Sequence, residues 1–305
     1  FMDEWVSLYK SKSGERGIFN RKAAKNQIKR LGDRRDPNHD FGTNPCSEII
    51  LRDREFCNLS EVVIRAKDTP DTLARKVRLA TILGTFQSTL TNFRYLSSDW
   101  KKNCEEERLL GVSLTGIMDN EITNGRAGGV DLKDVLDHLR HVAIETNKEY
   151  AHKLKINESA AITCVKPSGT VSLVAGELPG IHYAESENYY RTVRVAANSP
   201  FVPLLQEAGY RIEPAVSDPT RTVVVYFPVL LREGTISNKN ISIWEQFANA
   251  VDMQHYWADN QVSITITFNQ SEADQIARAL SAFDNRLKGV SLLPVSDHGY
   301  AQAPY

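Results

Sequence analysis

The chain alternates short β-branched runs with long amphipathic segments, and this alternation limits the folds that it can adopt. Helices are expected over five segments: 72–96, 105–118, 132–154, 243–257 and 271–287. Strand-like runs occupy five others: 49–51, 62–64, 160–165, 222–230 and 261–268. Asp68 or Thr69 can cap the first helix, with Pro70 in its first turn, and Ser271 is expected to cap the last. Strands that alternate with long helices favour an α/β fold with parallel strands.

The composition is that of a soluble globular enzyme, with 41% hydrophobic and 25% charged residues among 305. A formal net charge of −1 creates no general field for nucleic acid or anionic membrane, so we expect neither as a direct partner. Any binding of a phosphorylated ligand must therefore come from local features. The opening residues 1–5 are acidic and lack an apolar signal region, which predicts a cytoplasmic protein.

Four cysteines are too few for a secreted disulfide framework in so long a chain: Cys46, Cys57, Cys104 and Cys164. None forms a Cys-x-x-Cys pair, so no metal site is expected. Cys104 is expected to be a partly exposed, inert thiol at a helix start, and Cys164 a core residue. The remaining question is whether a thiol is catalytic, because a lone cysteine is most often a small buried side chain.

The segment Asn44-Pro45-Cys46-Ser47-Glu48 carries an amide, a thiol and a carboxylate at alternate positions. In an extended loop alternate side chains point the same way, so all three can meet one small ligand. A neighbouring carboxylate raises the pKa of a thiol. That is wrong for a thiolate nucleophile but acceptable for a thiol that gives up a hydrogen atom.

This motif, followed by Cys57-Asn58-Leu59, resembles the finger loop and next strand of class II, adenosylcobalamin-dependent ribonucleotide reductases. The resemblance implies that Cys46 becomes a thiyl radical and that Asn44 and Glu48 hold the substrate ribose. It also implies that Cys57 is one of two cysteines that form a disulfide while reducing the substrate. The family commonly has glycine where this chain has Ser47, which costs some backbone freedom.

A second motif, Lys166-Pro167-Ser168-Gly169-Thr170, lies between an expected strand and an expected helix. A helix start offers free N–H groups to anions, although the motif taken alone favours an ordinary helix cap over a phosphate site. It is not a P-loop. The run from Val165 to Ser172 resembles the reductase loop that receives the substrate's phosphates. The resemblance assigns phosphate binding to five residues: Pro167, Ser168, Gly169, Thr170 and Val171.

The resemblance extends from Gly17 to the end of the chain and implies a fold. We expect residues 1–305 to form the C-terminal part of the catalytic chain, a portion of a ten-stranded α/β barrel. The finger loop, at about 43–57, would thread its centre. The phosphate loop would span 166–171, and contacts to cobalamin are expected within about 200–305.

The implied activity is reduction of ribonucleotides, with triphosphates favoured, to 2′-deoxyribonucleotides. Adenosylcobalamin initiates the reaction, and the Cys46 thiyl removes the 3′-hydrogen of the ribose. Glu48 acts as base on the 3′-hydroxyl, while Asn44 hydrogen-bonds the substrate or orients Glu48. Cys57 and a partner cysteine end as a disulfide that a thioredoxin-like protein reduces.

The partner cysteine and the nucleotide-effector site are expected upstream of Phe1. We therefore expect this chain to need a missing N-terminal portion and to be inactive alone. The alternatives are a reductase of another class and an inactive nucleotide-binding fragment. Class I would need a tyrosine relay, whereas Tyr189 and Tyr190 read as packing residues, and residues 296–305 do not resemble a glycyl-radical loop.

Overall fold

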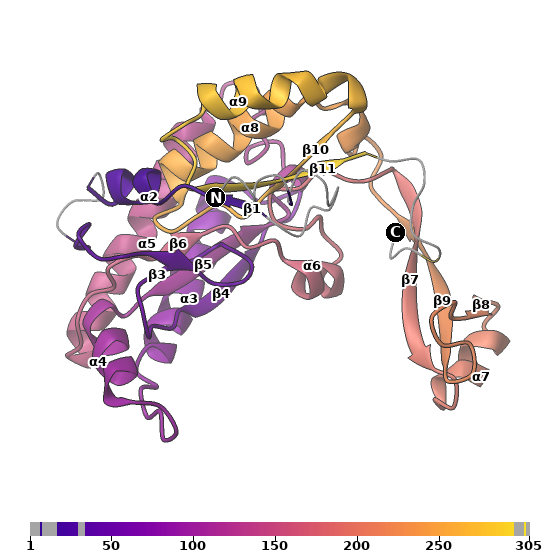
Figure 1. The fold of residues 1–305 in the computed structure, drawn as a ribbon, viewed down its shortest axis with the longest axis horizontal. Helices are drawn as coiled ribbons and strands as arrows, with labels where there is room; N and C mark the ends of the chain where they lie inside the picture. The colour runs from indigo at the N-terminus through magenta and orange to yellow at the C-terminus, as the bar shows by residue number, and fades with distance from the viewer. Residues whose placement is uncertain (1–6, 8–16, 30–33, 296–301, 303–305) are drawn as a thin grey trace. The chain divides into compact units, whose positions relative to one another are not determined.

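The computed structural model of the 305-residue chain describes Ser7, residues 17–29, residues 34–295 and Gln302. It shows an α/β protein that divides into two compact units (Figure 1). The first unit holds Phe1–His182 and Ser242–Pro294, and the second holds Tyr183–Ile241 and Val295–Tyr305. The expected α/β class is confirmed. Among the described residues no helix is both long enough and apolar enough to cross a membrane.

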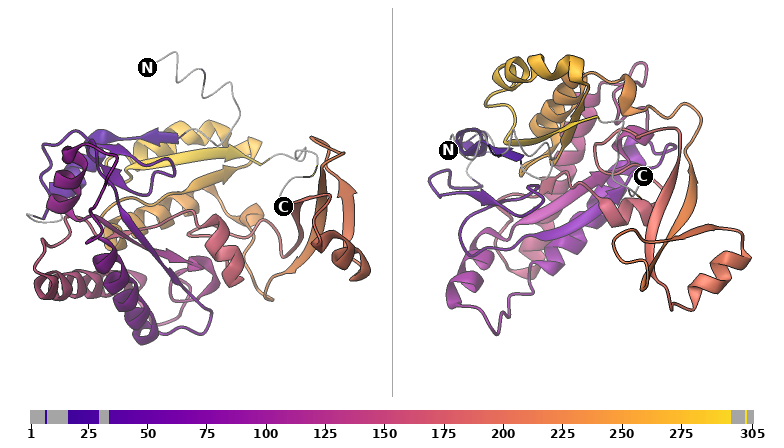
Figure 2. Two further views of the ribbon diagram at one scale, coloured as in Figure 1. Left: turned by 90° about the horizontal axis from the view of Figure 1, so that it is seen from below. Right: turned by 45° about the vertical axis from the view of Figure 1, so that its right-hand side comes forward.

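A three-stranded parallel sheet lies at the centre of the first unit, in the order β4 (Asn58–Val63), β5 (Leu110–Thr115), β6 (Thr163–Cys164). All six residues of β5 are buried, as a middle strand requires. Helix α3 (Pro70–Gln87) packs on β4 and β5, and α5 (Leu132–Leu154) packs on α3 (Figure 2). The sheet thus carries a helical layer on one face.

The second sheet of this unit joins residues from both ends of the chain. Strand β11 (Gly289–Pro294) pairs antiparallel with β1 (Gly17–Phe19) and parallel with β10 (Thr265–Phe268). Four further helical segments belong to the first unit: α2 (Arg21–Ile28), α8 (Ile243–Asp252), η5 (Gln270–Gln275) and α9 (Ile276–Ala282). The π-helical turn η4 (Met253–Trp257) continues α8 and packs on α5.

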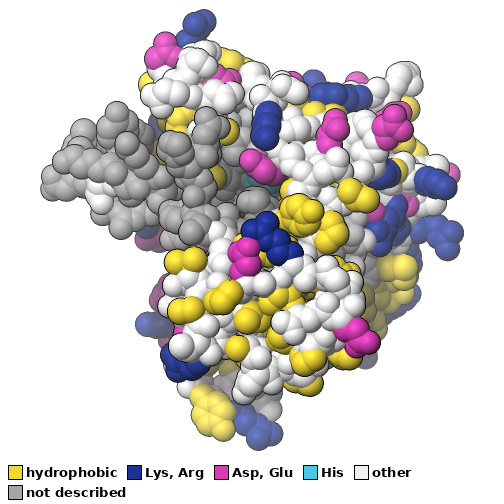
Figure 3. Space-filling model, turned by 90° about the vertical axis from the view of Figure 1, so that its right-hand side faces the viewer, with side chains coloured by type: hydrophobic (Ala, Val, Ile, Leu, Met, Phe, Trp, Pro, Cys, Tyr) yellow, Lys and Arg dark blue, Asp and Glu magenta, His cyan; other side chains and the backbone are white. Residues whose placement is uncertain are grey.

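The second unit is an antiparallel sheet in the order β7 (Asn188–Ala196), β9 (Thr222–Leu230), β8 (Arg211–Pro214), with α7 (Phe201–Glu207) in the connection. The expectation of parallel strands is therefore wrong for segment 222–230, although its bounds are confirmed. The ring of Tyr190 on β7 lies edge-to-face with that of Tyr226 on β9, 6.4 Å between centroids. Seen from the right-hand side of Figure 1, hydrophobic side chains lie among charged ones on the surface (Figure 3).

Local signals located several elements correctly. Helix α5 has the expected bounds, and α3 begins after Thr69 with Pro70 in its first turn. The N-terminal capping box of α3 pairs Thr69 with Thr72. At the last helical segment the capping residue is Asn269, bonded reciprocally to Glu272, and not Ser271. The cap lies two residues earlier because Ser271 already belongs to the 3₁₀ turn.

The helix expected over 105–118 is wrong. Helix α4 (Ser98–Glu107) ends at Arg108, which adopts a left-handed conformation with φ 46°, and the chain then enters β5. The apolar residues from Leu110 onward are buried because they form the middle strand of a sheet and not one face of a helix. Similarly, α3 ends at Gln87, short of the expected residue 96.

Candidate active site

The Cys46 segment is a tight turn between two short strands, β2 (Gly42–Thr43) and β3 (Ile50–Leu51), which pair antiparallel. Within it the Ser47 N–H donates to the Asn44 carbonyl at 2.9 Å, and the Ile49 N–H donates to Asn44 Oδ1 at 3.0 Å. The expectation of an extended loop is wrong. The side chains come together because the backbone reverses direction, and not because they alternate along a strand.

This turn brings Asn44 and Glu48 into contact. Asn44 Nδ2 donates to Glu48 Oε2 at 2.7 Å, so the amide orients the carboxylate. Glu48 is only 2% exposed, whereas Cys46 between them is exposed. The arrangement presents an accessible thiol beside a buried carboxylate that a neutral partner holds in place.

The electrostatics of Cys46 keep its sulfur protonated. Partial burial raises the pKa of the thiol, and the Glu48 carboxylate raises it further, while Lys166 acts in the opposite direction. The expected direction of the shift is confirmed. A protonated thiol at neutral pH retains the hydrogen that a radical reaction would remove, and it is a poor nucleophile.

Ser47 adopts a left-handed backbone conformation, with φ 65°. For a residue with a Cβ this conformation costs roughly 1–2 kcal/mol, which glycine avoids. The Ser47 hydroxyl donates to Thr43 Oγ1 at 3.1 Å, and this bond offsets part of the cost. The turn therefore explains physically why a glycine suits this position, and it tolerates the serine.

The turn is anchored from the region between η4 and β10. The Gln261 N–H donates to the Glu48 carbonyl at 3.0 Å, and the Ser263 hydroxyl donates to the Cys46 carbonyl at 2.6 Å. The Ser263 N–H in turn donates to the carbonyl of Val165, the residue before the Lys166 loop. One short segment therefore fixes both the Cys46 turn and the start of the 166–171 loop.

Cys57 lies directly before β4, and Gly111 on the neighbouring strand β5 leaves room for it. A Cβ on Gly111 would lie 3.2 Å from Cys57 Sγ and would collide with side chains of Ile49 and Leu59. Burial raises the pKa of the Cys57 thiol well above its usual value, followed by the charge of Glu48. The same carboxylate thus acts on both predicted reactive thiols.

The other two cysteines belong to the core. Cys164 on β6 is fully buried, as expected, in a cluster that includes Ile49 and Leu109. Cys104 is buried near the end of α4, where its Sγ accepts a hydrogen bond from the Phe56 N–H at 3.3 Å. The expectation of a partly exposed thiol is wrong, because α4 begins at Ser98 and packs its last turn inward.

The Lys166 loop connects β6 to a short helix, α6 (Gly169–Ala175), as expected. Gly169, Thr170 and Val171 are exposed, and nothing lies within 4 Å of a Cβ built on Gly169. Ser168 is buried instead, in a left-handed conformation with φ 54°. The exposed backbone of the loop is open to a ligand, whereas the Ser168 side chain faces inward.

Sequence reasoning missed Glu61, which belongs to this loop in space. Glu61 Oε2 lies 3.0 Å from Lys166 Nζ, and Oε1 accepts a hydrogen bond from the Ser168 hydroxyl. Its side chain is 6% exposed. A signal was available, because a glutamate directly before the β-branched run Val62-Val63-Ile64, in an expected strand, is unusual in a buried position unless it has a partner.

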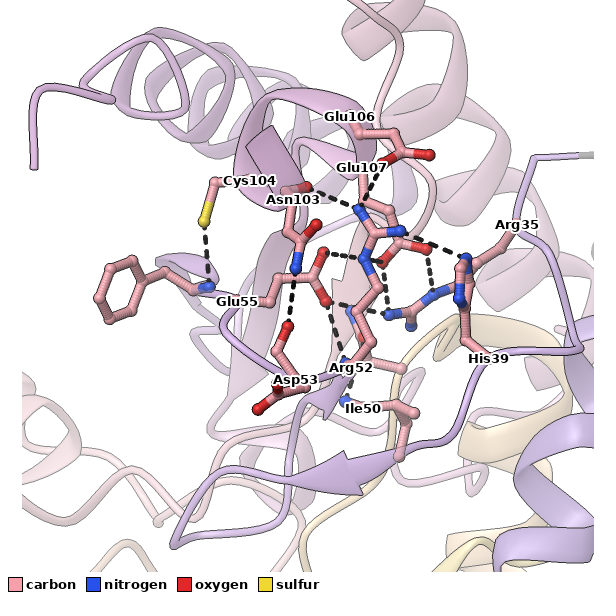
Figure 4. Close-up of polar contacts among 12 residues, drawn as sticks. Arg35, His39, Ile50, Arg52, Asp53, Glu55, Asn103, Cys104, Glu106 and Glu107 are labelled. Atoms are coloured by element: carbon pink, nitrogen blue, oxygen red, sulfur yellow. Dashed lines mark hydrogen bonds and ion pairs between the residues drawn. The ribbon is translucent and has the colours of Figure 1, made fainter. Parts of the chain in front are cut away.

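A buried ion-pair network holds the segment 52–57 between the Cys46 turn and Cys57 (Figure 4). Arg35 donates two hydrogen bonds to Glu107, at 3.1 and 2.7 Å, and lies 3.5 Å from Glu55. Arg52 approaches Glu55 to 3.4 Å. Burial, with Glu107 next, raises the pKa of Glu55 to about 9, so Glu55 is a neutral acid at pH 7.

Comparison with known proteins supports the resemblance. No family model matches the chain. It is 38% identical over 270 residues to the adenosylcobalamin-dependent ribonucleoside-triphosphate reductase of Euglena gracilis, a match that covers 87% of this chain and 36% of that protein. For the enzyme of the same name from Lacticaseibacillus paracasei the identity is 34% over 334 residues, covering 98% and 43%.

Solved structures of ribonucleotide reductases also resemble this chain. A B12-dependent, class II ribonucleotide reductase superposes with a TM-score of 0.74 at 30% identity, over 86% of this chain and 40% of that one. The class Id ribonucleotide reductase α subunit of Actinobacillus ureae, at 17% identity and a TM-score of 0.62, shares the fold. It covers 96% of this chain and 61% of that one.

The chain is therefore a homologue of part of a ribonucleotide reductase. Within that family its similarity is to the adenosylcobalamin-dependent, class II enzymes. It spans about two fifths of the length of the curated relatives that it matches.

Proposed function

We propose that this chain contributes the radical-bearing part of an enzyme that reduces ribonucleotides, preferentially triphosphates, to 2′-deoxyribonucleotides. The observation that carries the proposal is the Cys46 turn, where an exposed, protonated thiol lies beside the Asn44–Glu48 pair. The names and the fold of the relatives support it. The cytoplasm is the proposed location.

In this reaction Cys46 provides the thiyl radical that removes the 3′-hydrogen of the ribose. Adenosylcobalamin, when bound, supplies the radical chemistry that takes the hydrogen atom from the thiol. The structure fits this requirement because Cys46 is exposed and its raised pKa keeps the S–H bond intact at neutral pH. Contacts to the cofactor are proposed within about 200–305, a range that includes residues 296–301 and 303–305 outside the described part.

Glu48 then accepts the proton of the 3′-hydroxyl as water leaves C2′. Its carboxylate is buried and accepts a hydrogen bond from a neutral amide, so one oxygen is held while the other is available to the substrate. Asn44 thereby positions the base. Of the two roles expected for Asn44, the 2.7 Å contact favours orientation of Glu48.

Cys57 and a cysteine from outside this chain supply two electrons and two protons and end as a disulfide. The Cys46 thiol then returns the hydrogen atom to C3′ of the product radical, and Cys46 becomes the thiyl radical again. A thioredoxin-like protein reduces the disulfide. The partner cysteine and a nucleotide-effector site are proposed to lie in an N-terminal portion of the enzyme.

The loop 166–171 is proposed to receive the substrate's phosphates through its exposed residues, with Pro167 shaping the approach. The shared anchor at Ser263 supports this role because it links the loop to the Cys46 turn. The chain is proposed to form a portion of a ten-stranded α/β barrel, with the parallel strands β4, β5 and β6 among its strands and residues 43–57 as its finger loop. The class II structure supports this assignment.

The test uses the complete enzyme and adenosylcobalamin that carries tritium on its 5′ carbon. We expect release of tritium to water, together with deoxynucleotide formation, in the wild type and in a Cys104→Ser control. Cys46→Ser should abolish both, because a hydroxyl does not give up its hydrogen atom to a carbon radical. Nucleotide binding without tritium release in the wild type would instead indicate an inactive nucleotide-binding protein. Deoxynucleotide formation without the cofactor would indicate a reductase of another class.

A further inference from the structure

Glu61 on β4 makes contact with two donors of the loop 166–171 at once. One carboxylate oxygen forms an ion pair with Lys166 Nζ at 3.0 Å, and the other accepts the hydrogen of the Ser168 hydroxyl. The side chains of Glu61 and Lys166 are 6% and 22% exposed, so water screens the pair only in part. The carboxylate is thus built into the loop from a neighbouring strand.

These contacts engage the groups that an anion would use. Lys166 is the sole cation in the sequence of the loop, and its charge is balanced by Glu61. The Ser168 hydroxyl has one hydrogen to donate, and Glu61 accepts it. What remains for a ligand is the exposed backbone from Gly169 onward and the Thr170 hydroxyl.

We propose that Glu61 competes with phosphate for Lys166 and Ser168 and so lowers the affinity of the loop for phosphate esters. This inference rests on the proposed role of the loop in binding substrate phosphates. A bound phosphate either takes the two donors from Glu61, which leaves that buried carboxylate uncompensated beside it, or binds without their help, and both cost affinity. Weakened binding favours release of the product, which carries the same phosphates as the substrate.

The experiment measures binding of inorganic tripolyphosphate to the full 305-residue chain by titration calorimetry at low salt. Glu61→Gln keeps the size of the side chain and one acceptor but removes its charge. We expect it to tighten binding about tenfold, as loss of one nearby like charge predicts. The gain should shrink as salt is added. Glu177→Gln is the matched control, because Glu177 also forms a partly buried ion pair, with Arg65, beyond the other end of α6.

Two further variants separate competition from a purely structural clamp. Lys166→Met should weaken binding, because it leaves the Glu61 charge uncompensated. The double variant Glu61→Gln with Lys166→Met should return toward the wild-type affinity, because the loop is again neutral. Thermal unfolding of each variant verifies that the fold is retained.

The outcomes distinguish a failure of this inference from a failure of the proposed phosphate-binding role of the loop. Unchanged or weaker binding in folded Glu61→Gln, with clear binding by the wild type, overturns the role of Glu61 alone. Binding of tripolyphosphate that is weaker in the double variant than in Lys166→Met also overturns the role of Glu61. Glu61 would then support binding by holding the loop in place. Absence of tripolyphosphate binding in every form overturns both the competition and the proposed phosphate loop.

Discussion

Two buried glutamates near the Cys46 turn, Glu48 and Glu55, have opposite surroundings. Glu48 accepts a hydrogen bond from the neutral amide of Asn44. Glu55 lies between two arginines and beside a second carboxyl group, Glu107, and its raised pKa makes it a neutral acid at pH 7. Both are less than 5% exposed. Burial alone therefore does not determine what a carboxyl group can do, because its partners matter as well: the role proposed for Glu48 is that of a base, whereas Glu55 belongs to a structural ion-pair network.

The same substitution, glutamate to glutamine, tests this contrast at three positions. At Glu48 we expect the largest effect, on activity. Glu48→Gln in the complete enzyme should lower kcat by roughly 10²–10⁴-fold, the usual contribution of a general base. The Asn44 hydrogen bond can be retained by the glutamine oxygen, so thermal unfolding should change little. Full activity in this variant would remove Glu48 from the proton transfer.

At Glu107 we expect the main effect on stability. Glu107→Gln removes the charge that pairs with Arg35, whose side chain is 1% exposed. An uncompensated buried charge typically costs about 3–5 kcal/mol, and here Glu55 can ionise and offset part of it. The free energy of unfolding measured in urea should therefore fall by an amount near the lower end of that range. An unchanged midpoint would mean that the network contributes little to stability.

At Glu55 the effect on stability should be smallest at acid pH and should grow as pH rises. The folded-state pKa of about 9 lies above the ordinary value of 4.5, so the folded chain retains a proton that the unfolded chain releases. The stabilisation that comes from this retained proton is complete below pH 4.5. It is lost as pH rises to about 9, at no more than about 1.4 kcal/mol of unfolding free energy per pH unit. The lowered pKa of Glu107 acts in the opposite direction at acid pH.

Glu55→Gln should remove this dependence, because glutamine stays neutral throughout. Urea unfolding of wild type and variant at pH 6 and pH 9 measures it, with Glu177→Gln as a control outside the network. We expect the free energies of unfolding of the two proteins to differ less at pH 6 than at pH 9, where the variant should be the more stable. Parallel pH curves for the two proteins would show that Glu55 is ionised in the folded state.

The sequence by itself determined the features that depend on neighbouring residues. The spacing of Asn44, Cys46 and Glu48 predicted that an amide, a thiol and a carboxylate lie close together, although the turn that joins them was expected to be an extended loop. The bounds of α5 follow from a continuous amphipathic pattern, and the start of α3 follows from Thr69 and Pro70. These are local interactions, so local patterns reveal them.

Only the tertiary structure decided which distant groups surround the site. Glu61 meets Lys166 from 105 residues away, and Arg35 meets Glu107 from 72 residues away, because strands and loops that are far apart in sequence pack side by side. The segment from Leu110 is a strand and not a helix because it lies between β4 and β6. The side chains with proposed chemical roles at the Cys46 turn come from adjacent residues. Which charged groups lie beside the surrounding loops is decided by the packing of distant segments.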